Sequence, residues 1–100
     1  MLNSVKEELE EYRKGYDSGE MMSIIESQEG VFLCDKALKY LDKLQKINIP
    51  EETKIIVLKR YIKGLDADYI RYKYLITDLI KAIDRSSSIK TENTNVTIKR

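Results

Sequence analysis

The feature that most constrains the fold of this chain is a run of apolar residues spaced alternately three and four apart over residues 51–85. This spacing places every member on one side of an α-helix, and its persistence over several heptads is typical of a helix that packs lengthwise against another. We therefore expect one long C-terminal helix, over about residues 51–85, with coiled-coil-like packing. The members of this heptad stripe are Ile55, Leu58, Ile62, Leu65, Tyr69, Tyr72, Ile76, Leu79 and Ile83.

The alternative for this segment is two helices broken near Gly64. Glycine can end a helix, and Asp66 can cap the next one. The unbroken register favours a continuous or merely kinked helix. Two separate helices would not need their apolar residues to keep the same three-and-four spacing across the break.

Two earlier segments also have helical periodicity. Residues 1–16 form an amphipathic pattern, in which Ser4 and Glu7 have the spacing of a capping box. Residues 20–46 carry a broad apolar face and form either one bent helix or two, because Gly30 in the middle costs about 1 kcal/mol relative to alanine. We interpret Met21 and Met22 as part of the core.

These patterns predict an all-α fold, a small antiparallel helical bundle with short connections. We expect residues 1–85 to form a single helical domain and residues 86–100 to be a flexible polar tail. The chain's 100 residues suit one domain.

The heptad stripe is longer than the apolar surface that the rest of the chain offers it. Residues 55–83 span about 42 Å at roughly 1.5 Å per residue, and the apolar stripe of residues 31–44 covers about half of that length. We therefore expect the nine stripe residues to form an interface with a second copy, most simply in a dimer, or with another protein.

Composition excludes most enzyme classes. The chain contains no histidine and one cysteine, Cys34, which lies in an apolar run and is expected to be core. Its four glycines form no phosphate-binding loop. We predict a protein that is not an enzyme, with no catalytic residues, no metal site, no cofactor and no small-molecule substrate.

The same sequence also bears on where the protein resides. No apolar run approaches the roughly 20 residues needed to cross a bilayer, so we expect no membrane association. The charged N-terminal segment lacks the apolar core of a signal peptide, and we expect a cytoplasmic protein.

Charge is unevenly distributed along the chain. Residues 1–30 carry a net charge of −5 and residues 31–100 a net charge of +6. Basic residues lie near several tyrosines in the second part, as in surfaces that bind phosphates and stack on bases. The alternative function is thus a DNA-binding transcriptional regulator that uses Lys59, Arg60, Lys63, Arg71 and Lys73.

Residues 59–65 resemble the helix that precedes the sigma-factor-like helix-turn-helix units of phage regulators, and Asp66-Ala67-Asp68-Tyr69-Ile70 resembles the start of such a unit. The resemblance implies a DNA-binding helix pair. The chain then departs from the pattern, because Arg71 stands where a small residue is usual, Leu75 where the turn glycine is usual and Lys81 where an apolar group is usual. These departures remove both the turn and the buried face.

The function that these observations favour is a non-catalytic protein–protein interaction module, a small regulator, inhibitor or adaptor. Lysine and isoleucine occur 13 times each, against five arginines and three alanines. This bias is typical of the AT-rich genes of low-GC bacteria and of their phages and plasmids, which encode many small helical inhibitors.

Overall fold

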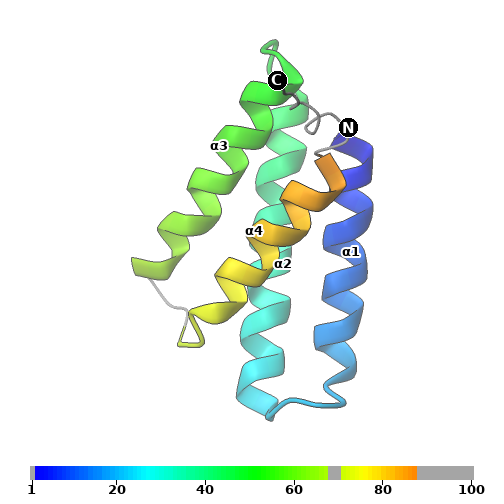
Figure 1. Cartoon of the computed structure of the whole chain (residues 1–100), viewed down its shortest axis with the longest axis vertical. Helices are drawn as coiled ribbons and strands as arrows, with labels where there is room; N and C mark the ends of the chain where they lie inside the picture. The colour runs from blue at the N-terminus through cyan, green and yellow to red at the C-terminus, as the bar shows by residue number, and fades with distance from the viewer. Residues whose placement is uncertain (1, 68–70, 88–100) are drawn as a thin grey trace, which may run out of the picture.

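The computed structural model describes residues 2–67 and 71–87, and within these ranges the chain is entirely helical. Consecutive helices run in opposite directions, so the described part forms an antiparallel bundle, as predicted (Figure 1). The elements are α1 (Leu2–Ser18), α2 (Ile24–Gln45), α3 (Glu51–Gly64), the short 3₁₀ helix η1 (Leu65–Ala67) and α4 (Tyr74–Ser87).

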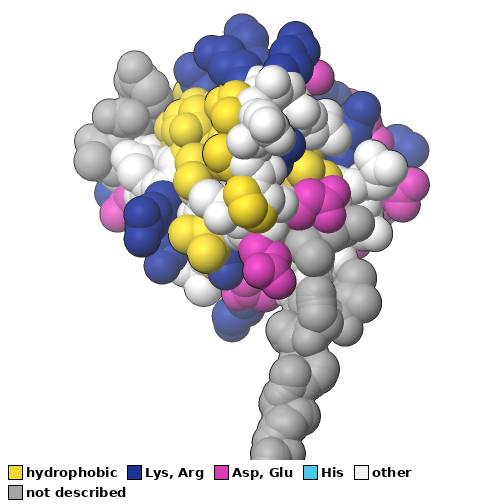
Figure 2. All heavy atoms as spheres, turned by 90° about the horizontal axis from the view of Figure 1, so that it is seen from above, with side chains coloured by type: hydrophobic (Ala, Val, Ile, Leu, Met, Phe, Trp, Pro, Cys, Tyr) yellow, Lys and Arg dark blue, Asp and Glu magenta, His cyan; other side chains and the backbone are white. Residues whose placement is uncertain are grey.

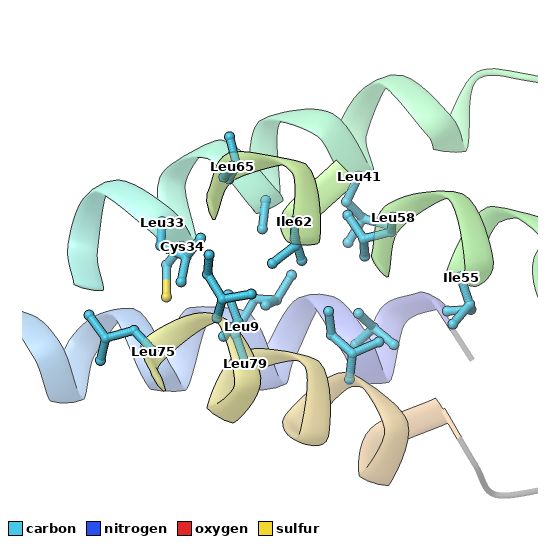
Figure 3. Packing of buried hydrophobic residues seen from close by; sticks show 14 of the residues in the cluster. Leu9, Leu33, Cys34, Leu41, Ile55, Leu58, Ile62, Leu65, Leu75 and Leu79 are labelled. Atoms are coloured by element: carbon cyan, nitrogen blue, oxygen red, sulfur yellow. The ribbon is translucent and has the colours of Figure 1, made fainter. Parts of the chain in front are cut away.

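The four α-helices enclose one apolar core. α1 packs against α2 and α4, and α3 also packs against both α2 and α4, so that each helix has two main neighbours. Every α-helix contributes side chains that are fully buried, each worth about 1.5–3 kcal/mol in apolar transfer (Figure 3). The largest of these are Leu9, Leu33, Leu41, Leu58, Ile62, Leu75, Leu79 and Ile83.

Residues 20–46 contain one helix and not two, α2 over Ile24–Gln45, and its start is fixed by a capping box that the sequence analysis missed. The Ser23 hydroxyl accepts a hydrogen bond from the Glu26 amide (3.1 Å), and the Glu26 carboxylate accepts one from the Ser23 amide (3.4 Å). The expected box at Ser4 is wrong, because α1 already begins at Leu2 and Ser4 lies inside the helix.

Gly30 of α2 lies directly against the Tyr16 ring of α1. A Cβ atom at this position would lie 2.4 Å from Cγ of the Tyr16 ring, far inside van der Waals contact. The absence of a side chain therefore lets the buried Tyr16 ring lie against the backbone of α2. This packing accounts for a glycine in the middle of a helix.

The predicted long C-terminal helix over residues 51–85 is wrong. α3 ends at Gly64, η1 follows, and the next described helix begins only at Tyr74. The chain reverses between them, so that α3 and α4 each bring their own half of the heptad stripe to a shared core (Figure 1). Two short helices bury this apolar surface within one chain, which a single rod could not do.

The last described residues extend the helical domain slightly. Ser86 and Ser87 are the end of α4, and their hydroxyls donate to the carbonyls of Ala82 and Ile83. The prediction of a flexible tail otherwise falls on residues 88–100, which lie outside the described residues.

Candidate interaction surface

The heptad stripe is covered by the chain itself. Tyr72 is half-buried against the core, and Tyr69 lies outside the described residues. Folding therefore removes the reason for expecting a partner along this stripe, namely an apolar length left uncovered. The other seven predicted interface residues are all buried: Ile55, Leu58, Ile62, Leu65, Ile76, Leu79 and Ile83.

Large apolar side chains are exposed instead where α1 turns into α2. Met21 is 94% exposed, Ile24 76% and Ile25 44%. The interpretation of Met21 as core is wrong, whereas its neighbour Met22 does pack against the core. Three apolar side chains bare to water within five residues are unusual for a free-standing surface and mark a candidate contact site.

One side of the start of α2 is exposed because α3 stops short of it (Figure 1). α2 has 22 residues, whereas α3 has 14, and the lower end of α3 lies well above the first turns of α2 (Figure 1). α1 covers only one side of these turns. Among residues 2–67 and 71–87, no helix buries Ile24 or Gln28 on the opposite side, which α3 covers further along.

The first turns of α2 have the ridge and the hollows of a surface against which another helix can pack. Ile24, Gln28 and Phe32 are spaced four residues apart and form one ridge. One hollow of about 430 Å³ is lined by Ile24, Gln28 and Val31, among others. A second hollow of about 460 Å³ is lined by Ile25, Gln28 and Phe32, again among others. When two helices pack, the ridges of one helix lie in the grooves beside such a ridge on the other.

Two polar side chains set the borders of this surface. Oε1 of Glu29 accepts hydrogen bonds from the backbone amides of Arg71 (2.7 Å) and Tyr72 (2.9 Å), and so ties the start of α4 to α2. Nζ of Lys36 lies 5.4 Å from the centroid of the Phe32 ring. The sequence pattern gave no signal for the Glu29 contact, because the two amides that donate to this carboxylate lie more than 40 residues further along the chain.

A second apolar group lies at the other end of the bundle, where α2 connects to α3. Figure 2 shows hydrophobic side chains gathered there among lysines and arginines. The exposed large members include Ile47 and Ile56, each about half covered. Neither side chain is as exposed as Met21 or Ile24, although both are as exposed as Ile25.

The basic residues predicted for nucleic acid do not form one free patch. Lys59 pairs with Asp84 at 2.6 Å and Lys73 with Asp66 at 2.8 Å, which leaves Arg60, Lys63 and Arg71 without an ion pair among the described residues. α4 is uninterrupted at Leu75, where a helix-turn-helix would turn. The described residues after Gly64 thus contain one α-helix and not the pair that the resemblance implies.

Neither an exposed thiol nor a cluster of metal ligands is found in residues 2–67 and 71–87. Cys34 is fully buried, and this burial raises the pKa of its thiol to about 12. No group of three potential ligands comes together in these ranges. None of the helices described is both long and apolar enough to cross a bilayer.

Comparison with family models, with curated proteins and with solved structures finds no match to this chain. The surface at the start of α2 therefore has to be interpreted from its own chemistry.

Proposed function

We propose that this protein is a non-catalytic interaction module, a small regulator, inhibitor or adaptor, that binds another protein chain through the start of α2. The observation that carries this proposal is the exposure of Met21 and Ile24, among the residues that the structure describes, where α1 turns into α2. Burying an isoleucine of this kind contributes about 1.5–3 kcal/mol, which a folded monomer in water forgoes.

The chemistry of the surface favours a protein partner. It is apolar at the centre, has Gln28 as a hydrogen-bonding group, and is bordered by the charged side chains of Glu29 and Lys36. An apolar centre with a polar rim is the usual composition of a protein interface. The alternation of ridge and hollow on this surface fits a helix better than a small molecule.

Site-specific photo-crosslinking in the cells that express the protein tests this proposal. A photoreactive phenylalanine analogue at position 24 should give a covalent adduct with a protein, because that side chain would face the partner. The same analogue at position 56 is the matched control, since Ile56 is also an exposed isoleucine but lies on α3. Adducts from position 56 but none from position 24 would contradict the proposal.

A further inference from the structure

We propose that the hollow between the end of α1 and the start of α2 binds a basic side chain, lysine or arginine, of the protein partner. This inference rests on the proposed function, because it names the chemical group by which the partner is held. It is carried by three features of the hollow: an uncompensated helix end, an unpaired carboxylate and a buried hydroxyl without a hydrogen-bond partner.

The hollow has a polar wall and an apolar wall. Its volume is about 430 Å³, and it lies at the end of the bundle where α1 turns into α2 (Figure 1). Asp17, Ser18 and Gly19 line it from α1 and the following turn. Ile24 and Val31 line it from α2, and Ile24 is mostly exposed. Lysine and arginine suit such a site, because their apolar stems cover apolar surface while the charged end stays in polar surroundings.

The end of α1 lacks the positive charge that usually stabilises the end of a helix. A basic residue in the last turn interacts favourably with the free carbonyls and with the negative end of the helix dipole. The last turn of α1 contains no basic residue. The carbonyls of Asp17 and Ser18 accept no hydrogen bond from the described residues. A cation in the hollow would supply the missing charge.

Asp17 adds a full negative charge at the same place. Its carboxylate forms no ion pair in the part of the chain that the structure describes. The basic residues one turn earlier are already engaged, since Arg13 pairs with Asp35 and Lys14 with Glu11. The hollow therefore attracts a basic side chain of a partner and repels an acidic one.

Ser27 provides the third feature. Its hydroxyl oxygen is buried against Gly19 and has no hydrogen-bond partner among the described residues. Buried hydroxyls are nearly always hydrogen-bonded, so an unpaired one indicates a polar group that comes from outside the chain. Ser27 lines the hollow, and rotation of its hydroxyl to another staggered position allows it to accept a bond from a donor that enters.

A metal ion fits this hollow less well than an organic cation does. Calcium and magnesium require six or more oxygen ligands, including several carboxylates or waters. No group of three potential metal ligands comes together in residues 2–67 and 71–87. The apolar wall formed by Ile24 and Val31 has no use for a metal ion but can cover the stem of a lysine or arginine side chain.

NMR titration of the full chain with small cations tests the inference. n-Butylammonium and n-butylguanidinium carry the charged ends of lysine and arginine, and n-butanol is the neutral control. Both cations should shift the methyl signals of Ile24 and Val31 in the millimolar range, with Ile56 unchanged. The cation that binds more tightly identifies the preferred side chain. Binding of n-butanol as tight as that of both cations would overturn the proposal.

Asp17→Asn tests the contribution of the carboxylate. Asp17 is exposed, so the substitution removes the charge and leaves the core intact. It should weaken the binding of both cations about threefold, as expected for an exposed ion pair. Glu10→Gln is the matched control, because Glu10 is an exposed carboxylate of α1 away from the hollow, and it should leave the affinity unchanged. Equal affinities of the wild-type and Asp17→Asn proteins would overturn the proposal.

The outcomes also separate this inference from the proposed function. If neither cation binds while position 24 still crosslinks to a protein in cells, the basic-side-chain proposal is wrong and the proposed function stands. If the cations bind but position 24 gives no adduct of any mass, the proposed function itself is contradicted.

Discussion

At the scale of single residues, Gly30 shows how a position that is unfavourable for a helix can be required by packing. Helix propensity alone gives a cost of about 1 kcal/mol for this glycine. The structure supplies the compensating reason, since the Tyr16 ring occupies the space of a Cβ atom. Such a contact joins residues on two helices, and no pattern within either helix reveals it.

Gly30→Ala should therefore destabilise the protein, although alanine is the better helix former. Forcing the Tyr16 ring aside costs about 1–3 kcal/mol, which exceeds the gain in propensity. Gly15→Ala is the matched control, because a Cβ atom there meets nothing within 4 Å, and it should stabilise by about 0.5–1 kcal/mol. Chemical denaturation measures both values, and a stabilised Gly30→Ala protein would refute the close contact.

The buried thiol makes a prediction about alkaline stability. Burial raises the pKa of Cys34 from 9.0 to about 12, and burial also raises the pKa of Tyr16 above its ordinary value of 10.0. Above pH 9 the unfolded chain therefore holds fewer protons than the folded chain, so the free energy of unfolding falls as pH rises.

Cys34→Ala should lose less stability between pH 9 and pH 12 than the wild-type protein, by up to about 1.4 kcal/mol per pH unit. Denaturant titrations at several pH values measure this difference. Identical slopes for the two proteins would show that the thiol titrates in the same way in both states.

At the scale of elements, the position and face of each helix could be predicted from apolar spacing, but the break between α3 and α4 could not. Each helix needs its own stripe, and two stripes keep a common register whenever the connection happens to have a matching length. Continuity of phase from Leu58 to Leu79 is therefore compatible with two helices. Gly64 and Asp66 were the local signals of the break, and they were outweighed by the regular spacing.

Glu29 should hold the α3–α4 connection in place. Glu29→Ala removes Oε1, the shared acceptor of the Arg71 and Tyr72 amide hydrogen bonds, and we expect a loss of about 1–2 kcal/mol. Hydrogen exchange should accelerate at these two amides, while the Leu41 amide in the core of α2 reports only the global change. Glu10→Ala, on the exposed face of α1, is the control. Unchanged exchange at residues 71 and 72 would contradict the contact.

At the scale of the whole molecule, the heptad stripe is buried by the chain's own helices, although its length in the sequence suggested that a partner must cover it. The fold class and most of the buried residues follow from periodicity alone, because periodicity identifies which side of each helix is apolar. The candidate surface does not follow, because exposure of Met21 and Ile24 depends on where α3 and α4 end relative to α2. Those relative lengths are set by the three-dimensional arrangement.

The distribution of ion pairs predicts weak affinity for nucleic acid. Lys59 and Lys73 are engaged by Asp84 and Asp66, and α4 carries as many acidic as basic residues. We expect no binding to duplex DNA at physiological salt and no change on Lys59→Glu with Lys63→Glu. Fluorescence anisotropy with a labelled duplex measures this. An affinity that falls steeply with salt concentration and is lost in the double variant would favour the DNA-binding alternative.

The most direct test of the account follows the isoleucine methyl groups of the full chain by NMR while the protein that crosslinks to position 24 is added. Contact through the start of α2 predicts shifts at Ile24 and Ile25 on this addition, with Ile56 and the core residue Ile62 unchanged. Shifts centred on Ile56, or no shift at Ile24 at any concentration of the added protein, would contradict the assignment of this surface to partner binding.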